Sequence, residues 1–367
     1  MKKLVYIAFA ILLGFSACTK VEQDVQPGRK ISFSAGSYAA RTKTGEETRT
    51  PFPTTNVFSS RAYLHAHGVN ETQDFFGTGE LISYISETNT WEPGYTTHRE
   101  YYWPFSDDSY INFVCWYDSD ANAGPATVSE TALAWTNRAI AASDEILYAD
   151  EAWRYNDNAN AVYYRVGVPV LFRQALARLR FEGQILSGKD MTASQLTKWE
   201  VLVTEMKVTN VHGEGSLSLT NADPQTASTC VPWTVTGGGW SATDTASDLV
   251  AINTTANPNG VGMSTTVSDL LAERSILPQA IDDMRLVVKW RIKTYHRTST
   301  SADFSTTPDS VEYLESTAVL TTAAVTEWAM GHKIKYTLVF DPSTDIITII
   351  PSVSSWDDAD SASVTVQ

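Results

Sequence analysis

Alternating apolar and polar residues recur along the chain and predict β-strands. In residues 284–293 apolar side chains alternate with mostly basic ones, and the same period of two occurs in residues 334–340 and 111–117. Such alternation places one face of a strand on a core and the other in water. Turn-forming clusters separate the apolar runs, at 118–125, 156–160, 237–239, 257–262 and 299–309. Many short strands with turns between them predict packed antiparallel sheets.

Helical patterns are rare. Residues 192–199 and 268–273 are candidates for short helices, and residues 171–181 fit a helix or an extended strand equally well. Residues 183–195 interrupt the apolar pattern with Gly183, Ser187 and Gly188, which predicts a domain boundary there. A chain of 367 residues is long enough for two domains at about 150 residues each. We therefore expect an all-β protein with two tandem antiparallel β-sandwich domains, 31–188 and 189–367, and few short helices.

The first seventeen residues resemble a targeting segment. Lys2 and Lys3 precede an apolar run, residues 4–15, which is too short to span a membrane. Small residues then lead to Cys18, as in a lipoprotein signal whose cysteine carries the lipid. The alternative is an ordinary secretory signal that happens to end near a cysteine. We expect a signal peptide at 1–17, a covalent lipid on Cys18 that anchors the protein to a membrane, and a polar tether at 18–30.

Composition and charge exclude some classes of function. The formal charge is 27 − 42 = −15, so no surplus of Lys and Arg is available to neutralise phosphates, and nucleic acid is not an expected partner. Besides Cys18 the chain has only Cys115 and Cys230, far apart in sequence. Cys115 lies in an apolar run, so we expect a buried free thiol and no disulfide framework.

Catalytic and metal-binding patterns are weak. His65 and His67 would point to the same side of a strand and are the best metal candidate, but no third ligand is evident and an exposed pair of histidines is favoured. Three pairs of adjacent aspartates, at 107–108, 282–283 and 357–358, are better explained as solvated turns than as calcium or acid/base sites. We expect no catalysis, no metal and no cofactor other than the lipid.

Nine segments, in their order along the chain, are similar to the fimbrillin family, the lipoprotein pilins and pilus-associated proteins of Bacteroidia. The resemblance covers nearly the whole sequence. One departure is Arg173-Gln174, where relatives often have a histidine. The segments are ACTK (17–20), ISFSA (31–35), TRT (48–50), YWP (102–104), INFVCWY (111–117), DEILYA (144–149), VLFRQALARL (170–179), ILPQ (276–279) and PSVSSW (351–356).

The resemblance implies two transthyretin-like β-sandwich domains in a lipoprotein carried to the outer membrane and the cell surface. In this family a trypsin-like protease cuts after an arginine in the loop that follows the first strand, and a strand from another subunit fills the groove. Here the lost strand would be residues 31–38, in which Ile31, Phe33 and Ala35 share one face. Arg49 is the preferred cut site and Arg41 the second; the alternative is an uncut surface loop.

The donated strand has one candidate in this chain. Ala362, Val364 and Val366 alternate with polar residues near the C-terminus, although this short tail would equally pair within its own domain. An open sheet edge beside apolar pockets binds an extended segment through backbone hydrogen bonds and alternate side chains. Insertion from head to tail does not close on itself and so generates a filament.

We therefore predict a structural or adhesive subunit of a surface fimbria, as stalk, tip or anchor, whose partners are other fimbrial subunits, a trypsin-like protease and host or bacterial surface glycans or proteins. The alternative is a monomeric glycan-binding lipoprotein that uses exposed aromatic residues, for example around Trp91 or Trp240, as stacking platforms.

Overall fold

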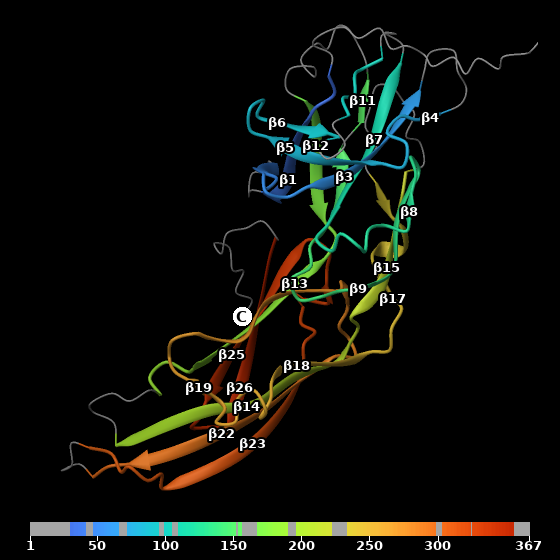
Figure 1. Ribbon diagram of the computed structural model, residues 1–367. Helices are drawn as coiled ribbons and strands as arrows, with labels where there is room; N and C mark the ends of the chain where they lie inside the picture. Colours follow the sequence, from blue (N-terminus) through green and yellow to red (C-terminus); the bar gives the residue numbers. More distant parts are fainter. Residues whose placement is uncertain are drawn as a thin grey trace, which may run out of the picture.

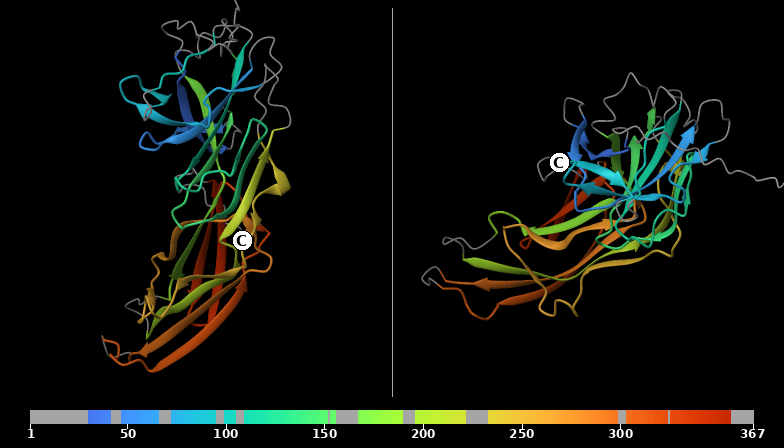
Figure 2. Two further views of the ribbon diagram at one scale, coloured as in Figure 1. Left: turned by 45° about the vertical axis from the view of Figure 1, so that its right-hand side comes forward. Right: turned by 45° about the horizontal axis from the view of Figure 1, so that its top comes forward.

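The protein is an elongated all-β molecule with two lobes, as Figures 1 and 2 show. The computed structural model describes residues 30–41, 47–65, 72–94, 99–104, 109–151, 153–155, 167–189, 196–221, 233–298, 303–323 and 325–355. Within these ranges the only helical element is the short 3-10 turn η2 (Thr236–Gly238). None of the helical structure described there is long and apolar enough to cross a membrane. The predicted all-β class is confirmed.

One ten-stranded sheet forms the N-terminal lobe, with the order β11-β7-β10-β12-β1-β6-β5-β3-β4 and with β2 beside β1. Strand β3 also pairs with β7, so seven strands, β7-β10-β12-β1-β6-β5-β3, close into a ring. The strands are β1 (Phe33–Arg41), β2 (Glu47–Pro51), β3 (Phe58–His65), β4 (Gln73–Asp74), β5 (Glu80–Ile85), β6 (Thr90–Pro93), β7 (Tyr110–Asp118), β10 (Ile146–Glu151), β11 (Trp153–Tyr155) and β12 (Val168–Gln174).

Two facing sheets form the C-terminal lobe. Their orders are β20-β13-β25-β26 and β18-β14-β22-β23, with β19 beside β14. The strands are β13 (Ala177–Ile185), β14 (Thr197–Val211), β18 (Ser247–Ile252), β19 (Val261–Met263), β20 (Ser268–Ile276), β22 (Arg285–His296), β23 (Ser310–Val319), β25 (His332–Asp341) and β26 (Ile346–Ser355). The predicted alternation at 284–293 and 334–340 is confirmed in β22 and β25, where every second side chain is buried.

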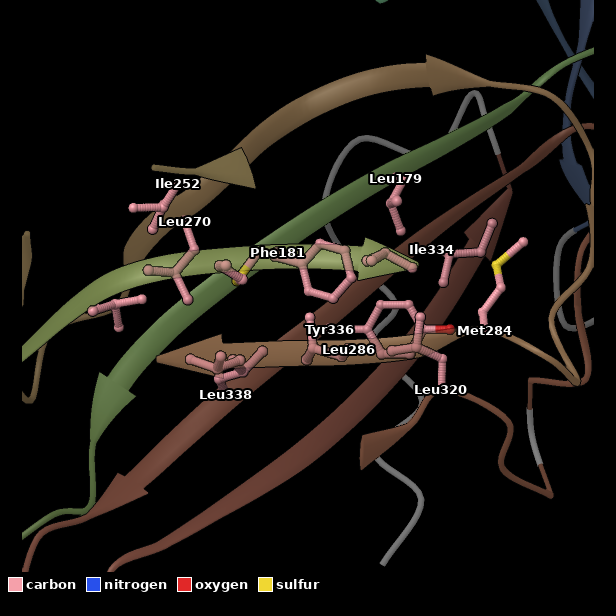
Figure 3. Packing of buried hydrophobic residues seen from close by; sticks show 14 of the residues in the cluster. Leu179, Phe181, Ile252, Leu270, Met284, Leu286, Leu320, Ile334, Tyr336 and Leu338 are labelled. Atoms are coloured by element: carbon pink, nitrogen blue, oxygen red, sulfur yellow. The ribbon is translucent and has the colours of Figure 1, made fainter. Parts of the chain in front are cut away.

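The core of the C-terminal lobe lies between these two sheets (Figure 3). Trp290 of β22 contacts Phe340 of β25 edge to face, with ring centroids 5.3 Å apart. Phe181 of β13 and Tyr336 of β25 are register partners and stack at 5.0 Å. Both sheets therefore contribute large apolar side chains to one continuous core, as in a β-sandwich.

A smaller sheet joins the lobes. Its order is β16-β15-β9-β8, with β17 beside β15, and a two-stranded pair, β21-β24, lies apart from it. The strands are β8 (Thr127–Val128), β9 (Ala132–Ala139), β15 (Glu214–Thr220), β16 (Thr234–Val235), β17 (Ser241–Ala242), β21 (Gln279–Ala280) and β24 (Glu327–Trp328).

The chain passes from β12 to β13 through Ala175 and Leu176, which are fully buried. Hydrogen bonds hold both residues: the Trp240 indole donates to the Ala175 carbonyl at 2.6 Å, and the Gly331 amide donates to the Leu176 carbonyl at 2.9 Å. Because these buried carbonyl groups are paired, the connection is fixed rather than a free linker.

A buried ion cluster lies beside this connection. Arg138, only 7% exposed, forms a bidentate pair with Asp118 at 2.8 and 3.2 Å and contacts Asp144 at 3.0 Å. The loop that carries Asp144 is tied to the other lobe, because the Ser275 amide of β20 donates to the Ala142 carbonyl at 2.8 Å. The cluster thus fixes the loop on which the two lobes meet.

The structure corrects the predicted helices. Residues 268–273 belong to strand β20, and of residues 192–199 the described part leads into strand β14. The ambiguous segment 171–181 is extended: it comprises the end of β12, the Ala175-Leu176 connection and the start of β13. The domain limits 31–188 and 189–367 stay a prediction, but residues 177–185, assigned to the first domain, pack in the core of the C-terminal lobe.

Candidate strand-insertion site

Strand β1 closes the ring of the N-terminal lobe. On one side it pairs parallel with β12, from Phe33 opposite Val168 to Ser37 opposite Phe172. On the other side it meets β6 through the single pair Phe33–Trp91 and then β2. β1 and β12 are the first and last strands of this lobe in the sequence, so no tight turn connects them. Backbone hydrogen bonds and side-chain packing therefore hold β1 against β12.

The side chains of β1 and the residues before it fill the core of the lobe. Ile31 and Phe33 are 0% exposed. The ring of Phe33 lies edge to face against Phe113 at 5.1 Å and against Phe58 at 5.9 Å. Ala35 is partly buried against the same cluster. The predicted shared face of Ile31, Phe33 and Ala35 is therefore confirmed.

A charged contact fixes the start of the strand. The ammonium of Lys30 lies 2.6 Å from Glu92 and 3.3 Å from Glu100. Partial burial lowers the pKa of Lys30, but the hydrogen bonds and charges of Glu92 and Glu100 outweigh this effect and leave the pKa raised. The Ile31 amide donates to the Tyr101 carbonyl at 2.8 Å, so the backbone is held at the same point.

Gly167 allows the close approach of β12 to β1. Its φ is +80°, and a Cβ built there would lie 2.6 Å from the carbonyl carbon of Phe33. The amide of the next residue, Val168, donates to the Ser32 carbonyl at 2.7 Å. Only glycine combines this backbone conformation with such a contact, so a glycine at position 167 is required for β1 to lie this close to the start of β12.

The two candidate cut sites flank the connection between β1 and β2. Arg41 is the last residue of β1, opposite Glu47, and Arg49 lies inside β2, opposite Tyr38. The expectation that both lie in a loop is wrong, because the β1–β2 ladder extends over both positions. No described strand pairs with the other edge of β2. A cut at either arginine leaves β1 attached to the lobe by noncovalent contacts alone.

Loss of β1 would change the lobe in two ways. The ring of strands would open between β12 and β6, leaving the backbone donors and acceptors of β12 that now face β1 without partners. The space now filled by Ile31 and Phe33 would become an apolar pocket beside that edge. An extended segment that runs parallel to β12 and carries apolar residues at alternate positions fits both features.

The structure places some of the other predicted residues in ordinary roles. His65 contacts Glu130 at 2.6 Å, and no group of three metal-ligating side chains occurs among the described residues. Asp282 and Asp283 are exposed in a turn. Cys115 is a buried free thiol, as predicted; it lies 3.3 Å from the Ser60 hydroxyl, and burial raises its pKa to about 12. Cys18, His67, the aspartate pairs 107–108 and 357–358, and the tail residues Ala362, Val364 and Val366 lie outside the described part.

The structure contradicts one of the two aromatic platforms named for the alternative reading, that at Trp91. Trp91 is only 4% exposed and packs against Phe58 and Phe52 in the core. Trp240 is partly buried, and its indole nitrogen already donates to the Ala175 carbonyl. A ring that stacks on a sugar must present an open face, which Trp91 does not.

Sequence reasoning missed the residues that receive β1. Val168, Val170 and Phe172 of β12 are all buried, and so is Phe52, whose ring lies 4.9 Å from that of Phe172. In β12 the adjacent residues Val170, Leu171 and Phe172 are each buried, so no alternation marks it as a strand. A glycine directly before an apolar run was the available signal.

The fold and the site define a layered β protein whose first strand completes a ring of strands and contributes side chains to the core of the N-terminal lobe. The sequence matches the family described as fimbrillin-like over residues 57–356, and the chain belongs to that family. No curated protein matched the sequence. Membership supports a structural, adhesive role in fimbriae at the cell surface rather than an enzymatic one.

Two solved structures are among those found similar to this chain. One is a fimbrial protein from Bacteroides vulgatus, with 14% identity, coverage of 89% of this chain and 99% of that chain, and a TM-score of 0.45. The other is a fimbrial assembly protein from Parabacteroides distasonis, with 10% identity, coverage of 89% and 95%, and a TM-score of 0.36.

Proposed function

We propose that the protein is a subunit of a surface fimbria that assembles when β1 is removed and a strand from another subunit takes its place. The supporting observation is the position of β1: it completes a ring of strands, buries Ile31 and Phe33, and is connected to the rest of the lobe through a segment flanked by Arg41 and Arg49. Replacement restores both the ladder and the core, so the inserted subunit is bound by the interactions that now hold β1.

A trypsin-like protease makes the cut in this proposal. Proteases bind their substrates as extended segments, and the free edge of β2 gives access to Arg49, whereas Arg41 borders the connection between the strands. Cleavage after Arg41 releases β1 with the residues before it, and cleavage after Arg49 also removes three of the five residues of β2. The new N-terminal residue, Thr42 or Thr50, distinguishes them.

The incoming strand must place an apolar side chain in the pocket that Phe33 now fills. The tail of this chain offers Ala362, Val364 and Val366 in the required alternation, with Val364 opposite the Phe33 position when Ala362 replaces Ile31. Valine is smaller than phenylalanine and leaves part of the pocket empty, which weakens binding. A donor with a large apolar residue at this position therefore binds more tightly than the tail.

Lipidation of Cys18 is part of the same proposal. A lipid anchor at the outer membrane holds the uncut chain at the site of assembly through the tether 18–30, and removal of β1 also removes the anchor. An anchor subunit would keep its lipid, and a stalk or tip subunit would lose it.

Limited trypsin treatment tests the proposal. Wild-type protein, cut after Arg41 or Arg49, is expected to form filaments visible by electron microscopy, and the double variant Arg41→Gln/Arg49→Gln is expected to form no filaments under the same treatment. Trimmed protein that loses β1, stays folded and forms no filaments, even when mixed with further subunits, would reject the proposal.

A further inference from the structure

Strand β23 is a long open edge of the C-terminal lobe. It ends the sheet β18-β14-β22-β23, and no described strand pairs with its outer side. Figure 1 shows it along the outer margin of the lobe. Its ladder with β22 runs over ten residue pairs without a register shift, from Arg285–Val319 to Thr294–Ser310. The strand is therefore regular and extended, which is the geometry that another strand can join.

The outward side chains of β23 are unusually apolar for an edge. Tyr313 is 74% exposed, Val319 55% and Val311 41%. The strand contains no proline, lysine or arginine, and its only charges are Glu312 and Glu315. Natural proteins protect open edges with proline, lysine, bulges or short strands, and β23 has none of these.

Other open edges of the same lobe do carry such protection. Strand β26 has Pro351 in its middle, which interrupts the row of backbone donors. Strand β20 contains three charged residues, including Arg274, and its pairing with β13 shifts register twice. Of these three edges, β23 alone combines an unshifted ladder with the absence of proline and of basic residues.

We propose that two copies of this chain pair antiparallel through their β23 edges, with Ser316 of one copy opposite Ser316 of the second copy. This register places Tyr313 of each copy opposite Val319 of the other, which covers the two most exposed apolar side chains of the strand. It also places Glu315 opposite Thr317 of the second copy. The alternative register centred on Glu315 would place Glu315 of one copy opposite Glu315 of the second copy, and these like charges would repel each other.

Basic residues of β22 lie behind the acidic edge. On the outer face of β22, Arg285, Lys289 and Arg291 lie opposite Val319, Glu315 and Tyr313 of β23. In the paired sheet each Glu315 keeps the Lys289 of its own copy as a cross-strand neighbour, which offsets the repulsion between the two acidic edges. An aromatic residue opposite a β-branched residue adds a favourable cross-strand contact on each side of the two-fold axis.

Sedimentation of the full chain with Cys18→Ser, so that no lipid drives association, tests the pairing. We expect a reversible dimer, with a fraction of dimeric protein that increases with protein concentration. Thr317→Glu sets two carboxylates opposite each other at two places and is expected to weaken the dimer about tenfold. The matched variant Thr317→Lys faces Glu315 of the second copy and is expected to hold the dimer at least as tightly. A monomer at every concentration, or equal weakening by both variants, would overturn the proposal.

A cross-link tests the register. With Cys18 and Cys230 replaced by serine, Ser316→Cys is expected to give an oxidised dimer, because two residues on the two-fold axis of an antiparallel pair have Cα atoms within disulfide reach. Glu315→Cys, one residue away, is expected to give little of this disulfide-linked dimer. Equal cross-linking of both variants would contradict the proposed register.

Discussion

Among the side chains of β1 that the structure describes, Phe33 makes the largest contribution to the core of the N-terminal lobe. Its side chain is fully buried and contacts Phe58 and Phe113. Phe33→Ala is expected to lower the free energy of unfolding of this lobe by about 3–5 kcal/mol, because it removes a large ring and leaves a cavity. Chemical denaturation followed by tryptophan fluorescence measures the change.

The matched control is Ser34→Ala, on the exposed side of the same strand. It is expected to change stability by less than about 0.5 kcal/mol. Equal effects of the two variants would mean that β1 is not packed in the lobe as described.

Cys115 reports on the same core through its chemistry. Burial raises its pKa to about 12 from the ordinary 9.0, so at pH 8 the thiolate fraction is about a thousandfold below that of an exposed cysteine. The thiolate is the reactive form. As long as the pH is below the pKa, each increase of one pH unit raises the thiolate fraction about tenfold. We expect very slow alkylation of native Cys18→Ser/Cys230→Ser protein at pH 8 and rapid alkylation after unfolding in urea. Equally fast labelling of both forms, measured by mass spectrometry, would contradict the burial.

At the scale of elements, β22 and β25 could be predicted from the sequence because each has one buried and one solvated face. Strand β20 could not: Leu270 and Leu271 are adjacent, and a register shift near Phe181 breaks its pairing with β13, so its pattern resembles one helical turn. Residues 175–177 are all fully buried, and without a polar face no period distinguishes a helix from a strand.

The candidate site was predictable only in part. The alternation of Ile31, Phe33 and Ala35 identified the strand, because it depends on residues close in sequence. Its neighbour β12 is more than 130 residues away, and parallel pairing over that separation leaves no local signal. Arg41 and Arg49 stood out as arginines in a polar segment, yet the ladder that places them in strands depends on the β1–β2 pairing.

The pocket left by β1 predicts a preference among donor strands. In protein cut after Arg41 and stripped of β1, a peptide of residues 30–41 is expected to bind at least tenfold more tightly than a peptide of residues 360–367, since phenylalanine fills the pocket more completely than valine. Fluorescence anisotropy of labelled peptides measures both affinities. A Phe33→Val version of the first peptide is the control and is expected to bind like the tail; equal binding of all three would refute the role of the pocket.

At the scale of the whole molecule, the lobes are joined by paired backbone groups and by the buried cluster of Arg138. Arg138→Met leaves Asp118 and Asp144 buried without their cation and is expected to cost about 3–5 kcal/mol. Arg178→Met removes a half-exposed pair with Glu273 and is expected to cost about 1 kcal/mol or less. Thermal unfolding compares them, and similar costs would show that the cluster does not support the junction.

A rigid connection between lobes suits a protein that forms part of a fibre, because tension applied to one lobe passes to the other through hydrogen-bonded backbone. In the two proposals these contacts have different partners. Replacement of β1 would join subunits along a filament, and pairing through the open β23 edge of the C-terminal lobe would join a subunit to a copy beside it.

The most direct test of the central claim follows β1 itself after cleavage. Protein cut after Arg41 is incubated with other subunits, and native mass spectrometry records whether the peptide that contains β1 stays bound. We predict that the peptide leaves as subunits join in chains, and that an excess of free peptide of residues 30–41 prevents the joining. Subunits that associate while every copy retains its β1 would contradict strand replacement as the basis of assembly.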